Sequence, residues 1–176
     1  MTSYCRYARN QPQGNHHREH HDTEHGFPPT DDDDLFRRMM LEISQAGLSF
    51  DIALKKKESI YEAFNSIDTV AGFSEKDIEQ LMHNQGIIRN RRKILAAITN
   101  AQKIQELQKE YGSFWNWLNK QNCTTREEWT KLFKKTFTFT GGEIVNEFMM
   151  SIGLLPGAHD QDCIVGKRIK KSRKIA

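Results

Sequence analysis

The sequence contains no run of about 18 or more consecutive apolar residues, which a transmembrane helix requires. Residues 1–11 include no apolar segment of the kind found in secretory signals. Mean hydropathy is −0.73, and charged residues make up 28% of the chain. These absences exclude a membrane-spanning protein and predict a cytoplasmic one.

Cysteine is scarce, and the three examples are Cys5, Cys123 and Cys163. An odd number of cysteines in a cytoplasmic protein argues against a disulfide framework and favours thiols or metal ligands. The sequence indicates no role for Cys123. The other two cysteines lie near the ends of the chain.

Strand-forming segments are almost missing, and no internal repeat is present. The alternating stretch TFTFTGG, residues 136–142, is a strand candidate, but too few others exist to build a sheet. A chain of 176 residues is large enough for one hydrophobic core. We therefore expect an all-α protein with a single domain over residues 1–166 and a basic, disordered tail over residues 167–176.

Apolar residues recur with helical spacing along most of the chain. Glycines at positions 47, 112 and 153 follow periodic segments and predict helix ends. Thr125 and Glu128 form the capping-box pattern that starts a helix. The predicted helices lie within residues 30–47, 50–64, 75–84, 89–112, 127–135 and 143–153.

The net charge of +3 is unevenly distributed. The stretch Lys167–Lys174 holds six basic residues and no acid, so the rest of the chain is mildly acidic. A basic segment suits contact with a phosphate backbone, and the alternative is a merely solvated chain end. A second basic cluster, part of which can be ordinary helix surface, comprises Arg89, Arg91, Arg92 and Lys93.

Potential metal ligands gather near both ends of the chain. Five of the seven histidines lie within residues 16–25, downstream of Cys5, and the pair His159 and Cys163 stands near the other end. Zinc favours four such ligands in a tetrahedral site, which here would join the two ends. The alternative is a solvated histidine-rich segment. Spacing alone leaves the N-terminal histidine ligand open among His16, His17, His20 and His21.

Five motifs occur together in an order typical of one enzyme family: HDTEHG (21–26), LFRRMMLEISQAGLSF (35–50), LKKKESIYEAF (54–64), GIIRNRRKILAAITNA (86–101) and FTFTGGEIVNEFMMSIGL (137–154). From about Cys5 to Cys163, the chain resembles 3-methyladenine DNA glycosylase I, a family of the helix-hairpin-helix glycosylase superfamily. The resemblance implies an all-helical fold of that superfamily. It also implies one structural zinc ion per chain, whose ligands would be Cys5, His21, His159 and Cys163.

The resemblance assigns base recognition to Glu42, within the stretch LEISQAGLSF. A purine methylated at N3 is cationic, so a buried carboxylate can pair with it and discriminate against neutral adenine. The positive charge also weakens the glycosidic bond, because the base departs as a neutral group. Accordingly, the resemblance implies hydrolysis without a general-base aspartate after the hairpin, and residues 143–153 contain none.

Two glycine-containing segments match the DNA contacts of the family. Gly47 and Leu48 would lie at the lesion, where the leucine fills the gap left by the extruded base. The alternative for Leu48 is a core residue next to a helix cap. Gly141 and Gly142 would hold a DNA phosphate at a helix N-terminus, and the alternative is an ordinary turn.

Three positions depart from the aromatic residues with which the family stacks the extruded base. Phe50 and His25 stand where the family has tryptophan, and His20 stands where it has tyrosine. If these histidines were protonated, they would repel a cationic base. The hairpin also departs from the usual residues at Thr136, Thr138 and Thr140.

We therefore expect a monofunctional DNA glycosylase that excises 3-methyladenine, with Phe50, His25 and His20 lining its base pocket. Its partner would be double-stranded DNA containing alkylated bases, which would place a bacterial-type, cytoplasmic protein at the nucleoid. No obligate protein partner is predicted, and a monomer is expected. One alternative is a catalytically impaired, zinc-stabilised DNA-binding protein of the same fold. Another is a metal-handling protein, which predicts more than one zinc ion per chain.

Overall fold

The computed structural model describes residues 3–173, and within this part of the chain all regular structure is helical. This confirms the predicted all-α class. No helix there combines the length and apolar character needed to cross a membrane. In chain order, the helices are α1 (Tyr4–Arg9), α2 (His16–Thr23), α3 (Asp32–Gln45), α4 (Phe50–Lys55), α5 (Lys57–Ala63), α6 (Ile67–Ala71), α7 (Glu75–His83), α8 (Arg91–Tyr111), α9 (Phe114–Asn119), α10 (Arg126–Thr136), α11 (Gly142–Ser151) and α12 (Ile164–Arg173).

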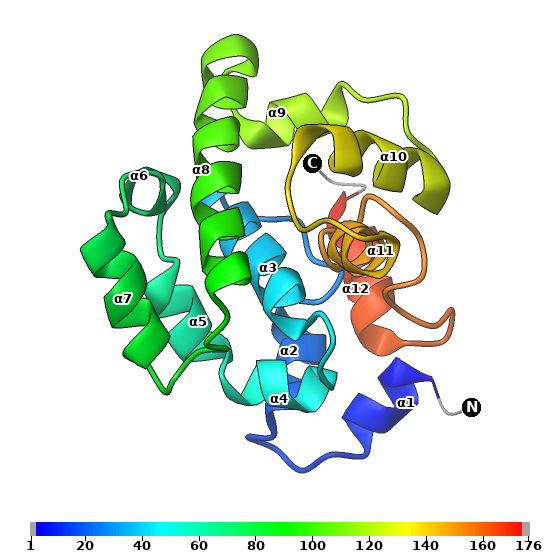
Figure 1. Cartoon of the computed structure of the whole chain (residues 1–176). Helices are drawn as coiled ribbons and strands as arrows, with labels where there is room; N and C mark the ends of the chain where they lie inside the picture. The colour runs from blue at the N-terminus through cyan, green and yellow to red at the C-terminus, as the bar shows by residue number, and fades with distance from the viewer. Residues whose placement is uncertain (1–2, 174–176) are drawn as a thin grey trace.

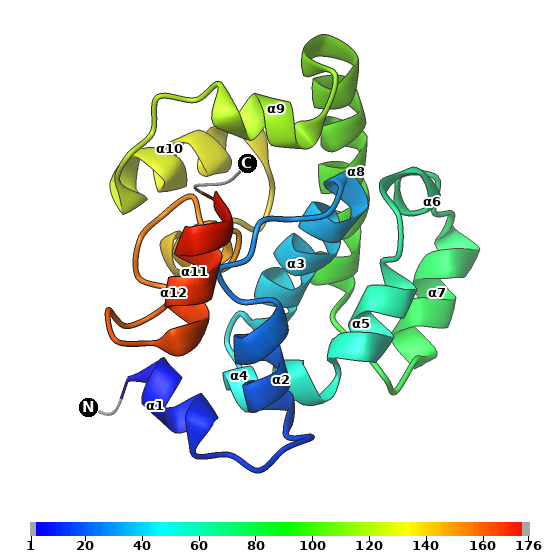
Figure 2. The ribbon, with the colours of Figure 1, turned by 180° about the vertical axis from the view of Figure 1, so that it is seen from behind.

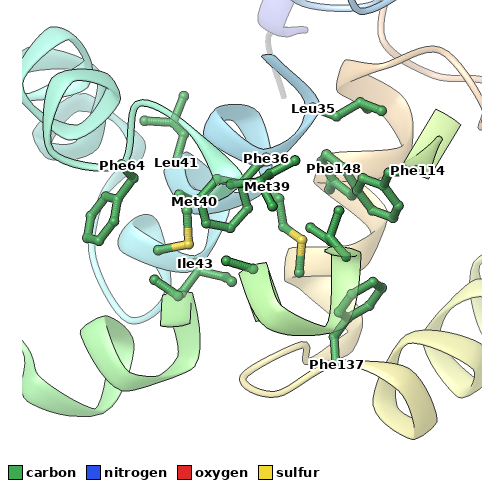
Figure 3. Close-up of a cluster of buried hydrophobic side chains, with 14 of the residues drawn as sticks. Leu35, Phe36, Met39, Met40, Leu41, Ile43, Phe64, Phe114, Phe137 and Phe148 are labelled. Carbon is green, nitrogen blue, oxygen red and sulfur yellow. The ribbon is translucent and has the colours of Figure 1, made fainter. Parts of the chain in front are cut away.

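Helix α3 runs through the centre of the molecule and contacts α4, α5, α6, α8, α9 and α11 (Figures 1 and 2). The Asp31 side chain caps its first turn by accepting a hydrogen bond from Asp34 N at 2.7 Å. Apolar residues then cover most of its circumference, as a helix surrounded by others requires. Figure 3 shows the resulting core, which includes Leu35, Phe36, Met39, Met40, Leu41 and Ile43 of α3.

Two groups of helices flank α3. Helices α5, α6 and α7 lie on one side, and α9, α10, α11 and α12 lie on the other (Figure 1). The long helix α8 contacts both groups through α6, α7 and α9. Asn90 caps its start, and Gly112 ends it with φ of 84°, a conformation that favours glycine.

The alternating segment 136–140 runs from the last residue of α10 into the hairpin loop before α11, so the strand considered for it is absent. Phe137 is buried in the core, whereas Thr138 faces the Asn100 side chain. Asn100 accepts from Thr138 N at 2.8 Å and donates to Thr138 O at 3.0 Å. The sequence alternates because the loop has one apolar and one polar contact surface, and this pattern imitates a strand.

The C-terminal basic segment was expected to be disordered, but it is helical as far as Arg173 in α12. Ile169 is buried, and Arg168 donates to Asp22 O at 2.7 Å. These contacts hold the helix against the N-terminal half of the chain. Residues 174–176 of the predicted tail lie outside the described part of the structure.

Other helix boundaries also differ from the sequence pattern. The helix predicted over residues 50–64 is divided at Lys56 into α4 and α5, where φ is −105°. The predicted capping box of Thr125 and Glu128 is confirmed at the start of α10. Helices α1, α2, α6 and α9 were not predicted, because segments of five to eight residues carry little periodic signal.

Candidate active site and metal centre

Glu42 is a buried carboxylate without a protein partner. It lies in the last third of α3 and is 4% exposed. Among the described residues, no hydrogen bond or ion pair reaches its side chain. Burial raises its pKa well above the ordinary range, and the nearby carboxylates of Glu147 and Glu24 raise it further. Such a group is costly in an empty protein, so it indicates a site for a positively charged or hydrogen-bonding ligand.

A pocket of about 300 Å³ adjoins Glu42. One wall is the loop after α3, in which Gly47 has φ of 80° and the Leu48 side chain is 41% exposed. The opposite wall is the first part of α11, with Glu143 and Glu147. The structure thus brings the predicted lesion-contacting residues next to the predicted base-recognising carboxylate.

Glu147 was missed by sequence reasoning. It is half-buried, and burial raises its pKa. Its spacing from Glu143 places two like charges on one helix face, an unfavourable arrangement that is a weak sequence signal for a functional role. Glu143 is exposed and is paired with Arg126, whereas Glu147 is the neighbour that raises the pKa of Glu42.

Lys93 supports the loop that carries Leu48. Its Nζ donates to Ser44 O and to Ala46 O, each at 2.8 Å, and so satisfies carbonyl groups at the end of α3. The side chain is buried, which lowers its pKa. The ammonium group also lies 5.9 Å from the centre of the Phe139 ring in the hairpin loop. Lys93 belongs to the basic cluster noted in the sequence, and it joins the loop after α3 to the hairpin loop between α10 and α11.

The three predicted pocket rings lie together in one cluster. The centre of the His20 ring is 5.3 Å from that of Phe50 and 5.6 Å from that of His25. None of the three lines the 300 Å³ pocket itself. Tyr4, which was not predicted, lies 5.5 Å from His25 and 6.0 Å from Phe50, and burial followed by the charge of Glu42 raises its pKa.

Burial disfavours the protonated form of both histidines of the ring cluster. Burial lowers the pKa of His20, and it lowers the pKa of His25 to about 3. His20 Nε2 and His25 Nδ1 have no hydrogen-bond partner among the described residues. The repulsion of a cationic base considered from the sequence is therefore weakened, and these two ring nitrogens are left without a protein partner among the described residues.

Glu24 of the HDTEHG motif orients this ring cluster. Its carboxylate accepts from Tyr61 Oη at 2.7 Å and from Lys57 Nζ at 3.0 Å, and it lies 3.1 Å from His20 Nδ1. Burial alone would raise the pKa of Glu24, but the partners, His20 foremost, lower it below the usual range. Glu24 is thus a fully paired carboxylate next to the unpaired Glu42.

Four predicted metal ligands converge where the two ends of the chain meet. His159 Nδ1 lies 3.2 Å from His21 Nε2, 3.6 Å from Cys5 Sγ and 3.5 Å from Cys163 Sγ. Tetrahedral zinc, with bonds of about 2.0 Å to nitrogen and 2.3 Å to sulfur, separates its ligand atoms by about 3.3 to 3.8 Å. The donor set therefore fits zinc in both chemistry and spacing.

Each histidine of this cluster has its second ring nitrogen occupied. His21 Nδ1 donates to Asp22 Oδ1 at 2.7 Å, and His159 Nε2 donates to the carbonyl oxygen of His25 at 2.7 Å. Such bonds leave the other nitrogen free to bind a metal. They also link the metal centre to the ring cluster, because His25 contributes a carbonyl group to His159 and a ring to that cluster.

The loop between α10 and α11 ends at Gly141 and Gly142, the N-cap and first residue of α11. No side chain caps this helix, and a Cβ atom at Gly141 would meet nothing within 4 Å. The first amide groups of α11 are therefore accessible from outside. The pairing of Glu143 with Arg126 reduces the negative charge beside them.

Comparisons with known proteins agree with this geometry. A family model described as methyladenine glycosylase matches residues 11–166. The DNA-3-methyladenine glycosylase 1 of Escherichia coli (strain K12) is 36% identical over 157 residues, covering 77% of this chain and 84% of the relative. The DNA-3-methyladenine glycosylase of Haemophilus influenzae is 34% identical over 166 residues, covering 82% and 89%.

Solved structures give the same result. A crystal structure of a variant of 3-methyladenine DNA glycosylase I in complex with 3-methyladenine has a TM-score of 0.78 and 30% identity, covering 93% of this chain and 97% of that one. The enzyme from Staphylococcus aureus has a TM-score of 0.75 and 31% identity, covering 88% and 93%. The chain therefore belongs to the methyladenine glycosylase family.

Proposed function

We propose that this protein is a DNA glycosylase that hydrolyses the N-glycosidic bond of 3-methyladenine in alkylated DNA. The observation that carries the proposal is Glu42, a buried and unpartnered carboxylate next to a pocket that is bordered by Leu48. Relatives that cover most of this chain are named for this activity.

Charge is the basis of selection. A 3-methyladenine nucleotide carries a positive charge. It can therefore form the ion pair with Glu42 that no described residue of the protein forms. Neutral adenine would leave the carboxylate uncompensated and would bind poorly. Glu147 adds a second negative group on the facing helix, so the pocket as a whole favours cations. Because the base leaves in neutral form, the reaction needs less assistance than hydrolysis of an ordinary nucleoside.

The ring cluster, which reaches toward Glu42 through Tyr4, is suited to hold the extruded base. Phe50 and Tyr4 offer aromatic faces, and His20 and His25 offer neutral rings with unpaired nitrogens. This cluster replaces the larger aromatic rings expected of the family. The same replacement favours the second candidate function, a DNA-binding protein of this fold without glycosylase activity.

DNA contact is assigned to two loops that the protein holds together. Leu48 is exposed on a glycine turn, from which an apolar side chain can fill the gap left by a base. The uncapped amides at Gly141 and Gly142 are suited to a phosphate, a contact that is independent of sequence. Lys93 spans from the first loop to the second and fixes their relative positions.

Zinc, bound to Cys5, His21, His159 and Cys163, would be structural. Four protein ligands leave no position for an activated water molecule. When bound, the metal supplies a cross-link between α1, α2 and the segment before α12. Its removal by a chelator should lower the midpoint of thermal unfolding.

The decisive experiment incubates the protein with methylated duplex DNA and measures the free bases released. Release of 3-methyladenine, without release of adenine, supports the proposed activity. Binding of the duplex without release of any base would overturn it and support the DNA-binding alternative. A Leu48→Ala variant should bind undamaged duplex normally and lose release, because the wedge acts only when a base is extruded.

A further inference from the structure

A second cluster of metal-ligating side chains lies outside the predicted zinc centre. His16 and His17 begin α2, and Asp51 lies in the first turn of α4. His16 Nε2 is 2.8 Å from Asp51 Oδ1, and His17 Nε2 is 3.4 Å from the same oxygen. One ligand atom from each residue lies within 4.8 Å of the other two.

His17 provides the second, independent observation. It is only 5% exposed, and neither of its ring nitrogens has a hydrogen-bond partner among the described residues. Buried polar groups in proteins are nearly always paired, so an unpaired buried imidazole indicates a missing ligand. Its Nε2 faces the Asp51 carboxylate without the alignment of a hydrogen bond, as two ligands of one ion do.

We propose that His16, His17 and Asp51 form a second site, which binds a divalent transition-metal ion. Two imidazole nitrogens and one carboxylate oxygen suit Zn²⁺, Co²⁺ or Ni²⁺ and leave further coordination positions for water. His16 and Asp51 are partly exposed, so an ion can enter from solvent. Without thiolate ligands, this site is weaker than the four-ligand centre.

A competing cation is already present at this cluster. Lys55 Nζ lies 2.7 Å from Asp51 Oδ2, and its side chain is 61% exposed. It pairs with Oδ2, whereas Oδ1 is hydrogen-bonded to His16 Nε2, so an entering ion would replace that one hydrogen bond. An exposed ion pair of this kind is weak, and it does not prevent binding of a divalent ion.

The two metal sites share helix α2 but no ligand. The Tyr4 ring packs between them, with its centre 6.1 Å from that of His17 and 6.0 Å from that of His21. An ion at the second site would fasten α2 to α4, which carries Phe50 in contact with His17. This inference stands on the side-chain geometry alone, independently of the proposed glycosylase activity.

Titration of the full chain with Co²⁺ separates the two sites. We expect two ions per chain, the first with the strong thiolate-to-cobalt absorption of a cysteine site and the second without it. In Asp51→Asn and His16→Ala, the first ion should bind as before, and the dissociation constant of the second should rise at least tenfold. The matched control is His83→Ala, an exposed histidine on α7, which should leave both events unchanged.

Three results would overturn the inference. The first is a wild-type chain that saturates at one cobalt ion. The second is binding of the second cobalt ion that persists in the double variant His16→Ala with Asp51→Asn. The third is loss of that binding in the His83→Ala control. Since His16 and Asp51 are partly exposed, their variants should fold, and circular dichroism checks this. Release of methylated bases by the wild type is measured separately, so failure of one proposal leaves the other intact.

Discussion

Arg38 and Glu42 lie one turn apart on α3, and both are buried and charged, yet their surroundings are opposite. Arg38 pairs with Asp34 through bonds of 3.2 and 2.8 Å and also donates to the carbonyl oxygen of Phe27 at 2.9 Å. Glu42 has no partner among the described residues. One charge therefore holds the fold together, whereas the other has no structural partner in the described part of the chain, as the proposed base-recognising role requires.

The difference shows how a protein can keep a costly group. Burial without a partner raises the pKa of Glu42, and a bound cation would favour its ionised form. The hydrogen bonds of Arg38 hold α3 and the preceding loop in place. Glu42 therefore cannot move to a new partner. Mutations at the two positions should therefore affect different properties.

The largest effect is expected for Arg38→Ala. It leaves the buried Asp34 carboxylate without its main partner, which should lower the free energy of unfolding by about 3 to 5 kcal/mol. Urea denaturation measures this change. The control is Arg37→Ala on the same helix, where one bond to the carbonyl oxygen of Asn65 is lost and the change should stay below about 1 kcal/mol. Equal effects of the two variants would contradict the comparison.

Glu42→Gln should lower activity without lowering stability. Loss of the charge that compensates the cationic base should lower kcat/KM for release of 3-methyladenine by about thirty-fold or more, equal to about 2 kcal/mol. The Gln variant should be at least as stable as the wild type near neutral pH. In the folded wild type the pKa of Glu42 is raised, so stability is lost as pH rises above the pKa of the unfolded chain.

Steady-state base release and urea denaturation, carried out on the same preparations, test this prediction. The matched control is Glu143→Gln, which removes the exposed carboxylate at the edge of the same pocket. It should change kcat/KM by no more than about two-fold and leave the free energy of unfolding nearly unchanged. A Glu42→Gln variant that is strongly destabilised and still selective would show that Glu42 is a structural charge like Arg38.

Lys93 is a third buried charge, and among the described residues its hydrogen bonds go to backbone carbonyls alone. The Lys93→Met variant extends the comparison to this position. It should lower the free energy of unfolding by about 1 to 2 kcal/mol, because Ser44 O and Ala46 O lose their donor. Base release should also fall, since these carbonyls end the helix before Leu48. Arg92→Met, an exposed neighbour, should change stability by about 0.5 kcal/mol or less. Similar losses in both variants would place Lys93 among ordinary surface cations.

Much of the fold was predictable because the longer helices carry their own signals. The helix α3 has acidic residues at its start and a glycine soon after its end, and α10 begins with the capping box of Thr125 and Glu128. The helix α12 was missed because its basic residues dominate its composition. Only the packing of Ile169 and Arg168 against other parts of the chain makes it a helix.

The candidate site was predictable only where a residue carries its role in a local motif. Glu42 and the Gly47 turn belong to one short motif, and the structure places them at one pocket. Glu147, Lys93 and Tyr4 were not found, because their roles depend on which helix faces them in the folded chain. A sequence pattern reports periodicity along one helix, whereas a shared pocket depends on the packing of several.

The smallest expected effect concerns the pH profile of Glu42. Cationic base binds the ionised carboxylate, so kcat/KM should rise with pH through the raised pKa of Glu42. In Glu147→Gln the nearest like charge is removed, so this rising limb should move to lower pH by about one unit or less. Glu24 also faces Glu42, but its own partners keep it ionised in both proteins. Glu143→Gln should leave the limb in place, and a profile that is unchanged in Glu147→Gln would show that the two carboxylates act independently.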